Sequence, residues 1–303
     1  MNSASKPEPM QRDIHEQNRL SWNAATAAHN SHKGDQAAFF RAGGDTLFPE
    51  ELELLGDLDG LDLLHLQCNS GQDTLSLARR GARATGVDIS DEAIRFAREL
   101  SAGSGIAAEF ERADVYDWLR DAVAAGRRFD RVFSSYGAVG WLSELEAWGR
   151  GIAGVLRPGG RFVLVELHPA AMMQGEDLRP RFPYRSYGTA IHEPEGIGDY
   201  VAASGLGLLH GAPGEAGVQD FRNPHPTWEF AWGISDVVTA LLDAGLVLEA
   251  LREWPYSNGC LIHPGMRADE NRRFHPPAGV PDLPLMFGVA ARKVPQDGQA
   301  VAP

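Results

Sequence analysis

The chain has 303 residues, of which 43% are hydrophobic and 23% charged, values typical of a globular protein. It carries 28 basic and 41 acidic residues, a net charge of −13, so neither nucleic acid nor an anionic membrane is an expected partner. Two cysteines are too few for a disulfide framework, and no signal-peptide pattern or apolar run of transmembrane length is present. We therefore expect a cytoplasmic protein, large enough for one α/β domain with a cap.

The N-terminal part of the chain is predicted to be helical after a short tail. Residues 1–12 are polar and contain two prolines, which predicts a disordered tail. The apolar spacing over 13–29 predicts an amphipathic helix, and a shorter helix is expected over 49–55. We expect residues 13–56 to form a helical cap and residues 57–303 to form the main domain.

The stretch from Leu63 to Ser90 carries the clearest functional signal. Its apolar run over 63–66 predicts a buried parallel strand, and a polar turn over 67–71 leads into a helix. A second strand then ends in Asp88. Such a βαβ unit offers backbone N–H groups at its turn and a carboxylate at its second strand, which together bind the adenosine end of a cofactor.

Alternating helices and strands continue through the rest of the chain. Strands are predicted at 108–111, 129–136, 161–166, 246–254 and 285–293, and helices at 91–100, 116–125 and 235–245 and in a segment ending at 156. The turn Arg157-Pro158-Gly159-Gly160 precedes the fifth strand, and its Pro-Gly pair suits a type II turn. Periodicity is lost over 170–232, where aromatic residues argue against disorder, so we expect an inserted lid.

On these motifs the chain resembles the class I S-adenosylmethionine-dependent methyltransferases, from about residue 63 to 293. Their first motif usually has an acid, an apolar residue and then glycines at alternate positions. The matching stretch here, His65-Leu66-Gln67-Cys68-Asn69-Ser70-Gly71, keeps only the last glycine and has His65 in place of the acid. The resemblance implies a Rossmann-like α/β fold: a doubly wound seven-stranded sheet with a closing antiparallel strand pair, an N-terminal helical cap and a lid after the fifth strand.

The resemblance also implies S-adenosylmethionine as the cofactor. Asp88 is then expected to accept the ribose hydroxyls. Asp114 is expected to accept the adenine amino group, or else only to cap the helix that follows it. The full set of residues expected to bind the cofactor is His65, Gln67, Asn69, Gly71, Gln72, Asp88, Ile89, Asp114, Val115 and Ser134.

Methyl transfer from a sulfonium needs chiefly orientation and exclusion of water, with a general base where the acceptor must lose a proton. His168 is the leading catalytic candidate because it follows the fifth strand, at the edge where open α/β sheets bind ligands. His225 is a further candidate, and both histidines could instead be structural. Tyr136, just beyond the fourth strand, could act in catalysis or could line the substrate pocket. The residues expected to bind a planar substrate are Trp22, Tyr184, Tyr187, Trp228 and Trp232. The last four lie in the predicted lid and could instead form its own core.

We therefore expect methyl transfer to a hydroxyl or nitrogen of a small aromatic or apolar molecule, without a metal. Two alternatives stay open. The unusual first motif allows a non-catalytic S-adenosylmethionine-binding protein. A nucleotide-dependent Rossmann oxidoreductase also carries an acid after its second strand, but the fingerprint G-x-G-x-x-G is missing, because Gln67 and Asn69 occupy glycine positions.

Overall fold

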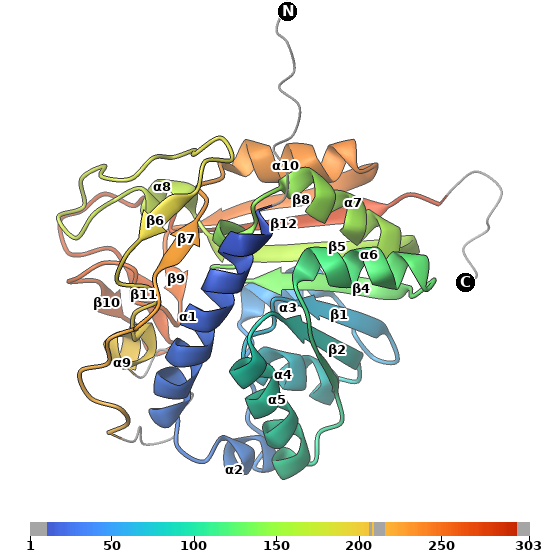
Figure 1. Ribbon diagram of the computed structural model, residues 1–303, viewed down its shortest axis with the longest axis horizontal. Coiled ribbons are helices and arrows are strands. Elements are labelled where there is room, and N and C mark those ends of the chain that lie inside the picture. The colour runs from blue at the N-terminus through green and yellow to red at the C-terminus, as the bar shows by residue number, and fades with distance from the viewer. Residues whose placement is uncertain (1–10, 206–207, 209–215, 296–303) are drawn as a thin grey trace, which may run out of the picture.

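The computed structural model describes residues 11–205, 208 and 216–295, and its centre is a seven-stranded sheet flanked by helices (Figure 1). The strand order is β3-β2-β1-β4-β5-β12-β8, in which the first five strands are parallel and β12 runs antiparallel to both of its neighbours. The strands are β1 (Asp62–Leu66), β2 (Arg83–Asp88), β3 (Glu109–Arg112), β4 (Phe129–Ser135), β5 (Leu156–Leu167), β8 (Leu246–Trp254) and β12 (Met286–Lys293). The predicted doubly wound sheet with a closing antiparallel pair is confirmed.

Helices cover both faces of this sheet. Trp148 and Ile152 of α7 and Leu241 of α10 belong to a buried cluster on one face, whereas Leu54 of α3 and Leu77 of α4 belong to a cluster on the other. The helices are α1 (Arg12–Ser31), α2 (Gln36–Arg41), α3 (Pro49–Leu55), α4 (Gln72–Arg79), α5 (Asp91–Ser104), α6 (Val115–Ala124), η1 (Val139–Trp141), α7 (Leu145–Val155), α8 (Pro169–Met172), α9 (Tyr200–Ser204) and α10 (Ile234–Asp243). Because β1 and β4 are neighbours, the strand order reverses there, and the carboxyl ends of the parallel strands meet at the edge where such sheets bind ligands.

Several local signals act as the sequence predicts. Ser90 caps α5 by accepting a hydrogen bond from the Ala93 N–H at 3.1 Å. Gly159 has φ +80°, as the third position of a type II turn requires. This turn lies within the range of β5, where the register with β4 also shifts.

Two segments interrupt the regular fold, and only the first was expected. The cover segment, residues 168–233 between β5 and α10, contains α8, α9 and the two-stranded sheet of β6 (Ile191–Glu193) and β7 (Thr227–Glu229). The second segment, residues 255–285, lies between β8 and β12 and is called the excursion below. It contains the three-stranded sheet of β9 (Ser257–Asn258), β10 (Arg267–Ala268) and β11 (Arg273–His275). Strands of two or three residues are too short to show a sequence period.

The first helix joins the cover segment to the sheet domain (Figure 1). The Asn18 side chain donates to the Trp228 carbonyl and accepts from the Trp228 N–H, both at 2.8 Å. On a neighbouring turn, the Asn23 amide oxygen accepts from the Ser90 hydroxyl at 2.7 Å. Helix α1 is therefore held between the cover segment and the start of α5. In the described part of the chain, every helix is too short or too polar to cross a membrane.

Candidate functional site

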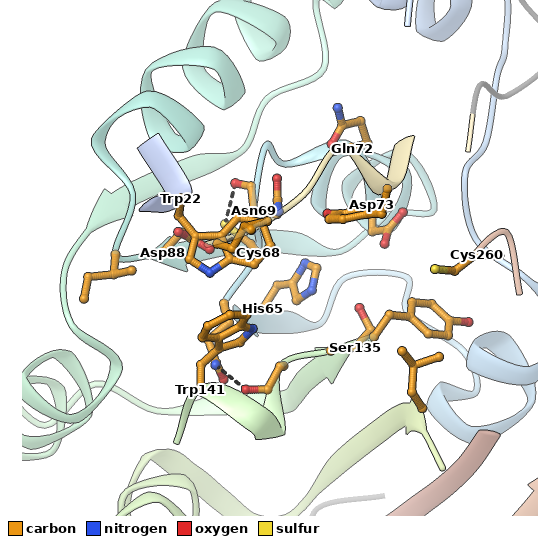
Figure 2. Close-up of a pocket in the computed structure, with 18 of the residues that line it drawn as sticks. Trp22, His65, Cys68, Asn69, Gln72, Asp73, Asp88, Ser135, Trp141 and Cys260 are labelled. Carbon is orange, nitrogen blue, oxygen red and sulfur yellow. Dashed lines mark hydrogen bonds between the residues drawn. The ribbon is translucent and has the colours of Figure 1, made fainter. Parts of the chain in front are cut away.

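A cavity of about 520 Å³ lies at the carboxyl ends of the parallel strands, within the size range typical of small-molecule sites. Its walls come from the ends of β1, β2 and β4, from α1, from the cover segment and from the excursion. Figure 2 shows Trp22, Asn69 and Asp88 on one side of the cavity and Cys260 on the other. Segments far apart in the chain thus enclose one space.

Asp88 is a buried carboxylate at one end of this cavity. It ends β2 and accepts hydrogen bonds from the backbone N–H groups of Asn69 and Ser90, each at 2.8 Å. Burial raises the pKa of Asp88 to about 6, although these backbone donors partly oppose the shift. At neutral pH the group is therefore mostly an ionised hydrogen-bond acceptor.

The turn after β1 keeps a glycine-like backbone although two of its alternate positions are not glycine. Gln67, Asn69 and Gly71 have φ values of +54°, +49° and +80°. Asparagine tolerates this left-handed region better than most residues, and the Asn69 side chain also accepts the Ser70 N–H at 2.7 Å. The unusual motif thus retains the turn that presents backbone N–H groups to a ligand.

Gln67 places an acceptor in the cavity wall. Its Nε2 donates to the Ala138 carbonyl at 2.7 Å, so the amide oxygen points away from that carbonyl. This oxygen is buried and has no hydrogen-bond partner among the described residues. A ligand with an N–H or O–H group can supply the missing donor.

His65 lines the same part of the cavity and is neutral. Its Nδ1 lies 2.9 Å from the Thr74 hydroxyl, and its ring packs against Phe133. Burial lowers the pKa of His65 to about 3, far below ordinary pH. His65 therefore does not supply the negative charge that the usual acid of this motif would carry.

The first turn of α4 contributes polar groups beside the turn. Gln72 Nε2 donates to the Gln36 side chain at 2.7 Å, which joins α4 to α2. Asp73 accepts from the Thr46 hydroxyl and also stabilises the charge of Lys33. Burial lowers the pKa of Lys33 to about 8, so near neutral pH most Lys33 side chains still carry a positive charge on the cavity wall.

At the other side of Asp88, the cavity wall contains Ile89, Asp114 and Val115. Asp114 caps α6 by accepting the Tyr116 N–H at 2.8 Å, and its second oxygen lies 2.7 Å from His15 Nδ1. Burial is the largest single influence and would raise the pKa of Asp114, but the His15 ring and the Tyr116 N–H together outweigh it and lower the pKa. The predicted capping role is present, and the carboxylate also lies in the cavity wall.

Of the predicted catalytic residues, only Tyr136 lines the cavity. His168 caps α8 instead, because its Nδ1 accepts the Ala170 N–H at 3.0 Å. Its Nε2 must therefore carry the proton, and it lies 2.9 Å from Glu253. His225 is held by its backbone, whose carbonyl accepts from the Ser21 hydroxyl. Neither histidine is positioned to take a proton in the cavity.

Most of the aromatic residues predicted to bind substrate pack elsewhere, and only Trp22 lines the cavity. Trp228 Nε1 donates to Gln17, Trp232 Nε1 donates to the Leu142 carbonyl, and Tyr187 is 84% exposed. Tyr184 is also outside the cavity wall, as are two residues of the predicted cofactor set, Gly71 and Ser134. The strand residue next to Ser134, Ser135, lines the cavity because adjacent strand residues face opposite sides.

Sequence reasoning missed a polar group at the far end of the cavity. Glu51 of α3 and Asn258 of β9 meet Tyr136 there, together with the excursion residues Cys260 and Leu261. The only sequence signals were an acid on the apolar face of a short helix and an Asn-Gly turn, and neither points to a shared site. The contact depends on the path of the whole chain.

Part of this chain is similar to known proteins. Residues 63–160 match a family model described as a methyltransferase domain. A ubiquinone biosynthesis O-methyltransferase of Methylobacterium sp. (strain 4-46) is 32% identical over 126 residues, which cover 42% of this chain and 46% of that protein. An S-adenosyl-L-methionine-dependent Diels-Alderase of Talaromyces variabilis is 30% identical over 122 residues. The matched residues cover 40% of this chain and 41% of the Diels-Alderase.

The chain thus spans less than half the length of these two relatives. Among solved structures, a S-adenosylmethionine-dependent methyltransferase from Mesorhizobium loti superimposes with a TM-score of 0.51 at 19% identity. This match covers 83% of the present chain and 99% of the other. It shows that the two proteins share a fold.

Proposed function

By its domain over residues 63–160 this chain belongs to the class I S-adenosylmethionine-dependent methyltransferases, and we propose that it transfers a methyl group from that cofactor to a small molecule held in the cavity. The observation that carries the proposal is the position of Asp88. This buried carboxylate closes β2 beside a left-handed turn, at the strand edge where a nucleoside can reach both. Carboxylates accept the two hydroxyls of a ribose in sites of this kind.

The residues present fit the polar groups of S-adenosylmethionine. Asp88 is an acceptor for the ribose diol, and the orphaned Gln67 amide oxygen is an acceptor for the ammonium group. Lys33 is a cation for the carboxylate of the methionine end, and it is otherwise balanced by Asp73. With His65 neutral, the ammonium would rely on the Gln67 dipole rather than on a charged partner.

The chain itself would supply enclosure and orientation, while the bound cofactor supplies an activated methyl group. Trp22 of α1 packs edge-on against Trp141, with ring centres 5.5 Å apart, at the roof of the cofactor end. We propose that the helical cap of residues 13–56 and the lid of residues 170–232 act together as this roof. Their hydrogen bonds through Asn18 support a joint role.

A small-molecule acceptor is supported by the size of the cavity and by an apolar part of its wall. That wall includes Leu167, Met172, Leu261 and Ile262. The matched relative named as a ubiquinone biosynthesis O-methyltransferase also fits this class of acceptor. The predicted aromatic sandwich in the lid is not part of the proposal, because those rings do not line the cavity.

Calorimetry with S-adenosylhomocysteine, followed by transfer of labelled methyl groups to the small-molecule fraction of a cell extract, tests the proposal. We expect binding by the wild-type chain and a labelled small molecule that depends on active protein. Binding without any labelled product would reject methyl transfer. Failure to bind S-adenosylhomocysteine would reject the cofactor assignment as well.

A second candidate is a cofactor-dependent reaction without methyl transfer. It is favoured by one observation, the matched relative named as an S-adenosyl-L-methionine-dependent Diels-Alderase. In that case S-adenosylmethionine would be recovered unchanged after extract compounds have been consumed. Mass spectrometry of cofactor and extract after incubation separates the two candidates.

A further inference from the structure

We propose that Glu51, Tyr136 and Asn258 form an acceptor-binding pole, in which Glu51 takes the proton from the nucleophilic O–H or N–H group of the methyl acceptor. This inference rests on the methyl transfer proposed above. The three residues come from α3, from the turn after β4 and from β9, and all three line the cavity. It adds to the proposed function a general base and a requirement for a hydrogen-bond donor on the acceptor.

The orientation of the Asn258 amide is fixed by its neighbours. Its Nδ2 donates to Glu50 Oε2 at 3.0 Å and to the Tyr136 hydroxyl at 2.9 Å. Both amide hydrogens are thereby used, and a flipped amide would point an oxygen at the Glu50 carboxylate. The amide oxygen is left buried, with no hydrogen-bond partner in the described part of the chain.

Glu51 also has a carboxylate oxygen that can accept a further hydrogen bond. One carboxylate oxygen accepts the Phe48 N–H at 2.8 Å and so caps α3. The other oxygen is fully buried and makes no well-formed hydrogen bond within the described residues, although the Tyr136 hydroxyl is close enough to stabilise the charged carboxylate. Capping therefore accounts for one oxygen of this carboxylate. The other oxygen remains available to a ligand, because Glu51 lines the cavity.

Two unpaired buried acceptors on one cavity wall favour a ligand that donates hydrogen bonds. A buried acceptor without a donor costs about 1–3 kcal/mol, which a bound O–H or N–H group would recover. Burial, together with the nearby Asp73 charge, holds the pKa of Glu51 well above its usual range. A carboxylate of raised pKa is a stronger base than an ordinary one, as proton transfer from an acceptor requires.

An outer layer of side chains holds this pole in place. Glu50 accepts from the Tyr256 hydroxyl at 2.7 Å and is paired with Arg273 of β11. The backbone of Tyr136 has φ +40°, a conformation that non-glycine residues rarely adopt. The next three backbone N–H groups all donate to the buried Glu166 carboxylate, which supports that strained turn.

The reaction step balances with groups already named. The acceptor oxygen or nitrogen forms a bond to the methyl carbon, and the bond between that carbon and the sulfonium sulfur breaks. The sulfur keeps the bonding electrons and leaves as the neutral thioether of S-adenosylhomocysteine. The acceptor proton moves to the unpaired oxygen of Glu51, which becomes a neutral carboxylic acid.

The test compares Glu51→Gln with Glu53→Gln. Glu53 lies on the same helix, is exposed and makes one weak contact with Arg252 at 3.8 Å, so its variant is the matched control. The probe is labelled methyl transfer to the small-molecule fraction of a cell extract, measured across pH. We expect Glu51→Gln to slow transfer by about 100- to 10,000-fold, the usual contribution of a general base. S-adenosylhomocysteine affinity should stay within about twofold, since Glu51 does not bind the cofactor.

The pH profile separates a base from a structural residue. In the wild-type chain the rate should fall as acid protonates Glu51, and this fall should be missing from the residual rate of Glu51→Gln. Tyr136→Phe, which keeps the ring, should shift this fall without removing it. Normal transfer by a folded Glu51→Gln variant would overturn this inference and leave methyl transfer intact. A wild-type chain that binds S-adenosylhomocysteine but transfers no methyl group would overturn both.

Discussion

The two ends of the cavity are built in different ways. At the cofactor end, the hydrogen bond from the Asn69 N–H to Asp88 joins residues 19 positions apart, within a single βαβ unit. At the acceptor end, the bond from Asn258 to Tyr136 joins residues 122 positions apart, in an excursion and a strand-end turn. In the proposed function, one local unit binds a cofactor common to a whole family, whereas segments inserted around that unit would contact the acceptor.

The two ends also differ in how their carboxylates are satisfied. Asp88 accepts from two backbone N–H groups, which limits the rise of its pKa to about 6. Glu51 accepts one backbone N–H and has no well-formed hydrogen bond to its second oxygen among the described residues, and burial holds its pKa well above the usual range. The first carboxylate is mostly charged and suits a permanent acceptor, while the second is suited to exchange a proton.

The largest effect expected on cofactor affinity is at the cofactor end. Asp88→Ala removes two charge-assisted hydrogen bonds to the ribose, each contributing about 1.5–3 kcal/mol. S-adenosylhomocysteine affinity, measured by calorimetry, should fall by about a hundredfold or more. Glu99→Ala, which removes an exposed acid of the following helix, should leave it unchanged. Unaltered affinity in the Asp88 variant would refute the cofactor assignment.

The next effect tests the support between the two ends. Glu166 accepts backbone N–H groups from Ala138 at 2.8 Å and Val139 at 3.0 Å, and also from Gly137 and Leu167. Glu166→Ala would strand several buried donors, so the free energy of unfolding should fall by about 3 kcal/mol or more.

Urea denaturation measures this loss, with Glu146→Ala on the exposed face of α7 as the control. A variant as stable as the control would mean that the turn after β4 does not depend on this carboxylate. Any effect of Glu166→Ala on the acceptor end could then not come from a distorted turn.

The sequence was sufficient for the regular part of the fold, and most of the residues that it suggested for cofactor binding lie in the cavity wall. The strand predicted over 246–254 has the same bounds as the observed β8, and the helix predicted over 49–55 has the same bounds as α3. These elements are specified by local periodicity, capping and turn chemistry. The Leu63–Ser90 unit was readable for the same reason, since its strand, turn and acid lie close together in the chain.

The acceptor end could not be predicted from the sequence because the residues that form it are far apart in the chain. His168 was predicted as a base from its place after β5, but its two ring nitrogens are used by Ala170 and Glu253. The excursion that carries Asn258 has strands too short for periodicity. Glu51 looks like an ordinary helix-capping acid until the chain path brings it to Tyr136.

The third effect compares two tryptophans, one at each kind of position. Trp232 packs against the main core and donates to the Leu142 carbonyl, whereas Trp22 lines the cavity. Trp232→Leu should lower the free energy of unfolding by about 2 kcal/mol and leave cofactor affinity unchanged. Trp22→Leu should do the reverse and weaken S-adenosylhomocysteine by several-fold, about 1 kcal/mol.

Thermal melts and calorimetry on both variants make this comparison. Loss of affinity in the Trp232 variant at unchanged stability would show that the cover segment contributes rings to the site after all. Loss of stability alone in the Trp22 variant would make α1 a packing helix without a role in binding.

The smallest effect is the pH dependence of cofactor affinity. The pKa of Asp88 is raised to about 6 in the folded chain without ligand, so acid neutralises the acceptor that the ribose hydroxyls need. Between about pH 7.5 and about pH 5, affinity for S-adenosylhomocysteine should fall by roughly tenfold, because the ionised fraction of Asp88 falls by about that factor.

Because the folded-state pKa of Asp88 is raised, its contribution to the free energy of unfolding changes with pH in the opposite direction. It is fully present below the unfolded pKa and is lost as pH rises through about 6. Cofactor affinity should therefore rise over the same interval in which this part of the ligand-free stability is lost. Asp88→Asn, which cannot ionise, should flatten both trends. Titration calorimetry and urea denaturation across this interval would detect the opposed slopes. An affinity that does not change with pH would mean that the buried carboxylate is not the ribose acceptor.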